Sequence, residues 1–415
     1  ELIPSATKTA AYNLDWRFGK KSKHICGDIT KLDSSIFKNS IGKNGCIVIG
    51  GPPCQAYSRV GKGKLRSLGE ERINTKDARG YLYQDFLRFA LELDAKAVVM
   101  ENVPESTNFG GENIPNKICR ILEKSGYNAI WTILNSADYG VPQIRERVFV
   151  IALKKSENLN YNLPKPTHSP RKSNKIFNEA RFETFNKYEF FRIPNKKTSV
   201  LNKWVTVGEA LSDLPILFES SNSKYKLNKL NMELSYSKDI SCRYQKIMRN
   251  WYGNSLKTLT GHAFRNSSRD FKIFARMKEG DNYLDASNIA DKILEERLNA
   301  VGRNIDRCSE EYKRLVKEIV PPYDREKFPN KWKKLDSKLP SHTLVAHLSQ
   351  DTYSHIHPFE PRGISVREAA RLQSFPDDFF FDCSMGEAFR QIGNAVPPLL
   401  AKGVADSIKK AFKEN

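Results

Sequence analysis

The sequence lacks the features that mark secreted and membrane proteins. No apolar run approaches the ~20 residues that span a bilayer, and the chain opens on a polar segment without the apolar core of a secretion signal. Its seven cysteines are scattered, and no Cys-x-x-Cys pair occurs. Such cysteines are typical of a reducing compartment and argue against both a disulfide framework and a structural zinc site. We therefore expect a cytoplasmic protein.

Acidic residues are in short supply. The chain has 48 Asp and Glu against 68 Lys and Arg, a net charge of +20. Residues 154–203 hold 12 basic and 4 acidic residues, and residues 221–340 hold 26 and 16, so these two stretches carry 18 of the 20 net charges. The excess favours a polyanionic partner, bound with a steep dependence on salt. The plainer alternative is a basic protein without such a partner.

The chain is organised around the stretch from Cys46 to Ser58. Its apolar residues from Ile47 to Ile49 are typical of a buried strand of a parallel sheet. Gly50-Gly51-Pro52-Pro53 ends that strand abruptly, and the turn places Cys54. Ligands of open α/β sheets bind beyond the carboxyl ends of the strands, where a thiolate can act as a nucleophile. A lone cysteine after a strand is otherwise a small buried hydrophobe.

Apolar periodicity predicts alternating helices and strands around this stretch. Strands are expected at residues 24–30, 97–100, 127–135 and 148–153, and helices at residues 6–13, 82–93 and 114–125. A Gly- and Lys-rich loop occupies residues 60–76. The alternation over short loops indicates an α/β fold with a mostly parallel sheet. The chain opens as though on the last residue of a strand, so we expect residues before Glu1 or a second chain in that place.

The middle of the chain shows weaker order. Pro, Lys and Asn accumulate through residues 154–203, which is typical of a connector, and residues 205–215 form a short ordered island. We identify no further element before about Leu256. Two amphipathic helices then follow, the second with Ser309 as its N-cap. Their apolar stripes are Ile289, Ile293, Leu294 and Leu298 in the first and Tyr312, Leu315, Val316 and Ile319 in the second.

Order returns near the end of the chain. Ser365 and Glu368 form a capping box that opens a helix through Leu372, and the segment Gly393–Pro398 opens a final helix. We therefore divide the chain into a first domain at residues 1–204 with its connector from about 154, a second, smaller domain at 205–340, and a return to the first domain at 341–415.

Five short motifs stand at the ends of predicted strands or the starts of helices. They are Pro53-Cys54-Gln55, Glu101-Asn102-Val103, Gln143-x-Arg145-x-Arg147, Arg367-x4-Leu372-Gln373-x-Phe375-Pro376 and Gly393-Asn394-x-Val396. In this order the set resembles the DNA (cytosine-5) methyltransferases of restriction–modification systems. The resemblance covers residues 1–153 and 339–415. It implies an S-adenosylmethionine-dependent, Rossmann-like domain, with a smaller DNA target-recognition domain in the basic middle.

The resemblance implies roles for the motif residues. Cys54 matches the nucleophile whose thiolate adds to carbon 6 of cytosine and activates carbon 5. Glu101 matches the acid that serves ring nitrogen 3, which requires a raised pKa. Arg145 is expected to contact the exocyclic oxygen of the base, a task suited to the guanidinium fork. Asn102 would hold the loop that carries Glu101, and Gln143 and Arg147 would support the geometry or contact phosphate.

The implied methyl donor is S-adenosylmethionine, with S-adenosylhomocysteine as its product. Glu1 matches the acid that holds the ribose hydroxyls, and Asp28 the residue that binds the adenine amine. The other expected cofactor-binding residues are Ile29, Pro53, Leu82, Asn394 and Val396. The family's first motif, Phe-x-Gly-x-Gly, is absent from this sequence, so we expect a missing segment or a second chain to supply it.

No metal is expected. The pair His355-x-His357 has no third ligand at a suitable spacing, and the implied chemistry needs none. The implied substrate also requires base flipping, because a cytosine stacked in the duplex must be turned out of it before it can react. The loop from Ser58 to Lys76 matches the family's mobile catalytic loop. The expected DNA-binding residues are Ser58, Arg79, Arg243, Arg249, Arg265, Arg269 and Thr343.

The sequence thus predicts a nucleoid-associated enzyme of a prokaryote or phage. Its partners would be double-stranded DNA and a restriction endonuclease that acts on the same site. One alternative is a tRNA cytosine-5 methyltransferase of the same family, against which the large basic insert argues. The other is a non-catalytic DNA-binding relative, against which the intact Cys54, Glu101 and Arg145 argue.

Overall fold

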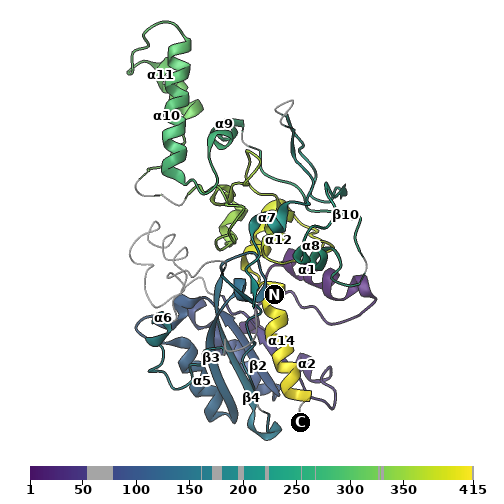
Figure 1. The fold of residues 1–415 in the computed structure, drawn as a ribbon. Coiled ribbons are helices and arrows are strands. Elements are labelled where there is room, and N and C mark those ends of the chain that lie inside the picture. The colour runs from purple at the N-terminus through teal and green to yellow at the C-terminus, as the bar shows by residue number, and fades with distance from the viewer. Residues whose placement is uncertain are drawn as a thin grey trace.

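The computed structural model describes residues 1–53, 78–159, 161–170, 180–194, 201–219, 224–253, 255–266, 268–325, 328 and 331–413. An α/β layer forms one end of the molecule, and a region of helices and short strands forms the other (Figure 1). The carboxyl-terminal part of the chain belongs to both, because α12 (Val366–Leu372) lies in the second region while α14 (Pro398–Lys413) runs along the sheet. Among the described helices, none is both long and apolar enough to cross a membrane.

The main sheet is mixed and has the order β1-β2-β4-β3. Its strands are β1 (Ile47–Gly50), β2 (Ala97–Asn102), β3 (Tyr127–Asn135) and β4 (Glu146–Lys154). β1 and β2 pair in parallel, whereas β4 is antiparallel to both of its neighbours. The α/β class is confirmed. Three strands share one direction as expected, but β4 opposes them, because the short segment 136–145 after β3 cannot supply the crossover that a parallel neighbour needs.

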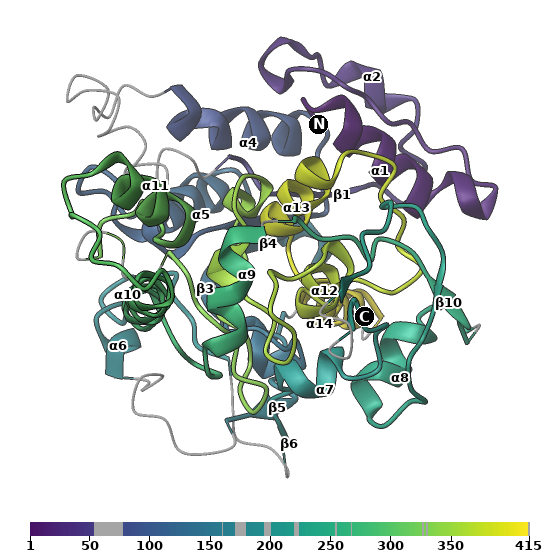
Figure 2. The ribbon, with the colours of Figure 1, turned by 90° about the horizontal axis from the view of Figure 1, so that it is seen from above.

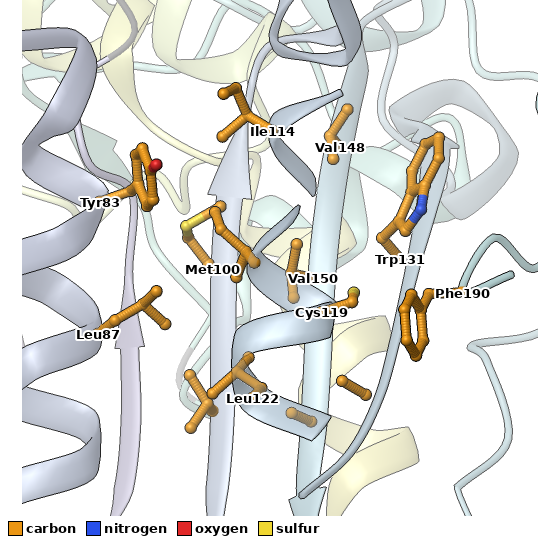
Figure 3. Close-up of a cluster of buried hydrophobic side chains, with 14 of the residues drawn as sticks. Tyr83, Leu87, Met100, Ile114, Cys119, Leu122, Trp131, Val148, Val150 and Phe190 are labelled. Atoms are coloured by element: carbon orange, nitrogen blue, oxygen red, sulfur yellow. The ribbon is translucent and has the colours of Figure 1, made fainter. Parts of the chain in front are cut away.

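Both faces of the sheet are covered. Alternate residues of the strands point to opposite faces, so Met100 and Val150 face α4 (Leu82–Glu92) and α5 (Ile114–Lys124), as Figure 3 shows. Val99 and Ile151 face the other way and pack with the buried stripe of α14. The predicted helices at 82–93 and 114–125 are therefore confirmed. The carboxyl ends of β1 and β2 point toward the second region, where the site lies.

Two strand predictions were wrong. Ile47 is 48% and Ile49 73% exposed, because β1 lies at the edge of the described sheet and is not enclosed. Residues 24–30 contain no strand. Gly27 donates one backbone hydrogen bond to the Glu1 carbonyl, and Asp28 then caps a 3-10 turn, Ile29–Lys31, which ends the extended segment. The predicted first helix is confirmed as α1 (Pro4–Leu14), and α2 (Ser35–Lys38) follows it.

The second region shares its core with the end of the chain. Side chains of α7 (Val207–Leu211) and α8 (Arg243–Arg249) pack with those of α12 and α13 (Met385–Asn394) in one apolar cluster. The sequence did not predict α8, because its seven residues are too few for a clear apolar period. The remaining short elements here and in the connector are α6 (Ala180–Glu183), β5 (His168–Ser169), β6 (Asn202–Lys203), β7 (Phe218–Glu219), β8 (Lys224–Tyr225), β9 (Leu234–Ser235) and β10 (Thr258–Leu259).

Three helices form a further lobe of the second region. They are α9 (Ser268–Arg276), α10 (Tyr283–Ala300) and α11 (Glu310–Ile319), and the last two confirm the predicted amphipathic pair, with Ser309 as N-cap. The arm, residues 283–319, projects from the molecule in Figure 1, and the view from above in Figure 2 shows α10 end-on. Its two ends meet at the base, where the Tyr283 hydroxyl donates to the Tyr323 carbonyl at 2.9 Å and Arg325 pairs with Asp291 at 2.7 Å.

Buried histidines make the fold sensitive to acid. The rings of the half-buried His342 and the buried His355 stack with centroids 3.9 Å apart, and His357, also buried, lies nearby in the sequence. Burial lowers the pKa of all three, to about 4 for His342 and His357. The folded protein therefore keeps them neutral at pH values where the unfolded chain, with its usual pKa near 6.5, takes up protons.

We expect the free energy of unfolding to fall as the pH drops from about 6.5 toward 4. Each such histidine contributes a slope of up to about 1.4 kcal/mol per pH unit. Chemical denaturation at pH 7.5, 6.5 and 5.5 measures this slope. A His342→Phe variant should show a shallower slope than the unchanged protein, and equal slopes would contradict the expectation.

Candidate active site

The site begins where β1 and β2 end side by side. The turn Gly50–Pro53 leaves β1, and Asn102 at the end of β2 donates from Nδ2 to the Pro52 carbonyl at 3.4 Å. A methyl group on Gly51 would lie 3.0 Å from Oε2 of Glu101, so glycine lets the turn approach that carboxylate. Cys54 and Ser58 lie outside the described residues, but the backbone that leads into Cys54 therefore passes beside Glu101.

Glu101 forms an ion pair with Arg147. The Nε atom of Arg147, near the start of β4, lies 2.8 Å from Oε1 of Glu101, and the two side chains are only 12% and 15% exposed. Burial raises the pKa of the Glu101 carboxyl above its usual value, while Arg147 and, less strongly, Arg145 oppose that rise. A carboxyl whose pKa burial raises thus sits beside a fixed positive charge, an arrangement suited to proton transfer.

The structure reverses the expected roles of the two arginines. Arg145 is only 1% exposed, and its guanidinium donates to the carbonyls of Leu344, Gly393 and Ala395 at 2.6, 2.9 and 3.1 Å. A guanidinium held in this way cannot also reach a substrate, so the prediction that Arg145 contacts the base is wrong. Arg147, two residues along, is the arginine that lies beside Glu101.

Gln143 is also fully buried. Its amide nitrogen, Nε2, donates to the Leu372 carbonyl at 3.2 Å and to the side chain of Gln373. Its amide oxygen, Oε1, accepts from the Leu344 backbone N–H at 3.0 Å. These bonds tie Gln143 to residues 344, 372 and 373 in the interior. The role of Gln373 was not assigned from the sequence, although it stands in one of the five motifs.

The amino-terminal cofactor candidates lie close together. The hydrogen bond from Gly27 to the Glu1 carbonyl, at 2.9 Å, joins the segments that carry Glu1 and Asp28. Asp28 accepts from the Thr30 backbone and hydroxyl, which lowers the pKa of its carboxyl. Arg88 of α4 donates to the Ile29 carbonyl at 3.0 Å and so ties this turn to the helix that begins at Leu82.

The remaining cofactor candidates lie at other edges of the site. Ile29, Leu82 and Val396 are half-buried, while Pro53 and Asn394 are exposed. Val396 packs on the sheet face formed by Val99 and Ile151. Asn394 ends α13. Two carboxylates beside half-buried aliphatic side chains fit a nucleoside, which has hydroxyls and an amine at its rim and a flat apolar face.

The predicted DNA contacts fall into different environments. Arg243 is exposed at the start of α8, whereas Arg249 at its end is buried and pairs with Asp213 at 2.6 Å. Arg265 donates to the Ser349 carbonyl, and Arg269 pairs with Asp270 at 2.6 Å. The hydroxyl of Thr343 donates to the Ile144 carbonyl at 2.8 Å. The side chain of Arg79 lies outside the described residues.

The prediction that Arg249 contacts DNA is wrong, because Arg249 belongs to a buried ionic network. Arg371 of α12 donates to both Asp213 and Asp377, and Asp213 also accepts a hydrogen bond from Arg249. The charges of two arginines and two aspartates thus cancel in the shared core. The Arg249 guanidinium also stacks on Tyr236, 3.5 Å from the ring centroid. The sequence could not reveal this, since the partners lie 36 and 158 residues apart.

Arg249 and Arg243 form a matched pair for a test. Arg249→Ala should lower the free energy of unfolding by about 3 kcal/mol, because it breaks a buried ion pair. Arg243→Ala should leave stability unchanged and, if Arg243 contacts phosphate, reduce the slope of log affinity against log salt by about one. Denaturant unfolding and salt titrations of DNA binding measure the two effects. An Arg249→Ala variant of unchanged stability would contradict the structural role.

One cluster in the described part of the chain has ligands spaced as for a metal: His357, Glu360 and Glu368. The sequence spacing indicated no third ligand beside the pair His355-x-His357, whereas the structure places two carboxylates near His357. Arg362 lies among them, fully buried, and donates to both carboxylates at 2.7–2.8 Å. The Arg362 guanidinium thus stands where a metal cation would bind. The cluster is a set of buried ion pairs within residues 357–368.

Comparison with known proteins agrees with this geometry. The family model of the C-5 cytosine-specific DNA methylases matches residues 4–410. A protein of Oceanobacillus iheyensis, provisionally named type II methyltransferase M.OihORF3336P, is 54% identical over 99% of this chain and 89% of its own length. The type II methyltransferase M.AgeI of Thalassovita gelatinovora is 31% identical over 88% of this chain and 83% of its own.

A solved structure shows the same fold. It is that of a DNA modification methyltransferase, provisionally so named, encoded within an E. coli prophage. It aligns with a TM-score of 0.62 over 99% of this chain and 91% of that one, at 23% identity. The family match covers nearly the whole sequence and includes both regions of the structure. The chain belongs to the C-5 cytosine-specific DNA methylase family.

Proposed function

We propose that the chain is the modification enzyme of a restriction–modification system and methylates carbon 5 of cytosine in double-stranded DNA. The observation that carries the proposal is the Glu101–Arg147 pair beside the turn that leads into Cys54. An acid of raised pKa and a guanidinium there match the two polar edges of a cytosine ring. Membership of the family and the type II methyltransferase names of the relatives support it.

In the proposed reaction the Cys54 thiolate forms a bond to carbon 6 of the flipped cytosine. The electron pair of the C5–C6 double bond shifts through the ring toward nitrogen 3, where the proton of Glu101 stabilises it. Arg147 donates to the exocyclic oxygen and holds Glu101 in place. Carbon 5 then takes the methyl group, its own proton leaves to a base, and the thiolate departs as the double bond returns.

S-adenosylmethionine supplies the methyl group as an electrophile. We assign the ribose hydroxyls to Glu1 and the adenine amine to Asp28, because both carboxylates lie on joined segments. Ile29 and Leu82 would contact the adenine ring, and Pro53, Asn394 and Val396 the rest of the molecule. The first cofactor motif of the family is not in this sequence, and a second polypeptide that carries it is a proposed partner.

We assign target recognition to residues 205–340. Charge supports this division, since within residues 221–340 the arm holds 7 basic and 8 acidic residues and the remainder 19 and 8. Five basic residues of the arm or next to it are held in ion pairs with Glu296, Glu311, Glu310, Glu318 and Asp291. The net positive charge of residues 221–340 therefore lies outside the arm, in the body of this region. A restriction endonuclease for the same site is the other proposed partner.

Bisulfite sequencing tests the function. Plasmid DNA from cells that lack cytosine methylation and express this chain should show protected cytosines in one short repeated sequence. Methyl transfer by the purified protein to duplex DNA and to tRNA separates the two catalytic alternatives. Transfer to tRNA alone would replace the proposal by the tRNA enzyme, and tight DNA binding without transfer to either substrate would replace it by the binding protein.

A further inference from the structure

Arg145 lies between the two sides of the proposed site. On the DNA side, residues 341–344 run beside residues 142–145 as a short parallel ladder. Ser341 donates to Pro142 at 2.9 Å, Ile144 donates to Ser341 at 2.8 Å, and Leu344 is bound to Gln143. The Thr343 hydroxyl closes the ladder on Ile144. The segment that carries Thr343 is therefore fixed to the residues that lead into β4.

The same residues hold the cofactor side. Arg145 donates to the carbonyls of Gly393 and Ala395, which flank Asn394. Gln373, itself bound to Gln143, donates to Ala395 at 2.7 Å and to Ile392 at 3.1 Å. A methyl group at Gly393 would overlap the backbone of Val345 and Ala346, so the two sides also touch directly.

We propose that Arg145 is a positioning residue that couples the binding of DNA to the binding of the methyl donor. One rigid guanidinium bonds Leu344 on the DNA side and Gly393 and Ala395 on the cofactor side, so a shift of either segment moves the hydrogen-bond partners of the other. Coupled sites of this kind change each other's affinity by the same factor. The inference rests on the proposed function, which assigns Thr343 to DNA and Asn394 and Val396 to the cofactor.

Calorimetry of S-adenosylhomocysteine binding, with and without a duplex that carries the methylated site, tests the coupling. In the unchanged protein, saturating DNA should alter the dissociation constant at least 5-fold, within the usual range of such effects. Arg145→Lys keeps the charge but loses the fork that spans three carbonyls. This variant should bring the ratio of the two constants to within 2-fold of one.

Two controls separate coupling from general damage. Arg147→Lys should slow methyl transfer but keep the ratio of the unchanged protein. Arg249→Lys alters another buried arginine, so it should lower the melting temperature and also keep the ratio. If Arg145→Lys does not fold, Gln373→Met interrupts the same bridge at Ala395 and should give the same loss of coupling.

The outcomes are distinct from those that test the function. If the unchanged protein methylates DNA but shows no coupling, or if the folded Arg145→Lys or Gln373→Met variant keeps the full ratio, the inference is overturned while the function stands. Absence of methyl transfer by the unchanged protein would remove the proposed function itself, and with it the basis of this inference.

Discussion

Cys54→Ala is expected to lower the rate of methyl transfer by at least about 10⁴-fold, because loss of a covalent nucleophile leaves only binding and electrostatic stabilisation. Carbon 5 of cytosine is a poor nucleophile until a group adds to carbon 6. Initial rates of transfer from labelled S-adenosylmethionine to duplex DNA measure the effect.

A second readout reports the covalent bond itself. In a duplex with fluorine at carbon 5 of the target, no proton can leave from that carbon after methylation, so the adduct persists. The unchanged protein should form a denaturation-resistant complex with this duplex, and Cys54→Ala should form none. Cys308→Ala, in the exposed loop of the arm, serves as a matched control and should retain both activities. Trapping by Cys54→Ala would assign the nucleophile elsewhere.

Glu101→Gln should lower the rate by about 10² to 10⁴-fold, the usual contribution of a general acid. Glutamine can still donate a hydrogen bond to nitrogen 3 but cannot give up a proton. Since burial raises the pKa of Glu101, the protonated form persists above pH 4.5 and is lost as the pH rises. The rate of the unchanged protein should therefore fall on the alkaline side of its pH profile, and the profile of Glu101→Gln should lose that limb.

Arg147 gives the matched control for this profile. Its charge opposes the rise in the Glu101 pKa, so Arg147→Gln should raise that pKa and move the alkaline limb to higher pH. Rates measured at saturating substrates over the whole pH range in which the protein stays folded test this prediction. A limb that stays in place in both variants would show that Glu101 is not the titrating acid.

Much of the secondary structure could be predicted because its signals are local. The capping box at Ser365 and Glu368 and the apolar stripe of α14 each depend on residues within a few positions, and the structure has both. The direction of β4 and the exposure of Ile49 depend instead on which strands become neighbours. That pairing is settled by distant segments, which local periodicity does not describe.

The site shows the same division. Glu101 and Asn102 could be placed from the sequence, because a residue at the carboxyl end of a strand has few other positions to occupy. Arg145 and Arg147 could not be told apart, since their motif puts both at the start of β4. Their roles differ only because the carbonyls of Leu344, Gly393 and Ala395 surround one of them. Arg249 was misassigned for the same reason, since its partner Asp213 is distant in the sequence.

The arm has a consequence for how this chain can change length. Because Tyr283 and Tyr323 join its two ends, the backbone enters and leaves the arm at one point. A segment whose two ends lie together can change in length at little cost to stability, because the entropic cost of closing a loop grows only slowly with the number of its residues. Residues can be inserted or removed between α10 and α11 without displacing the body of the region. The loop between α10 and α11 is therefore a suitable site for inserting an additional domain.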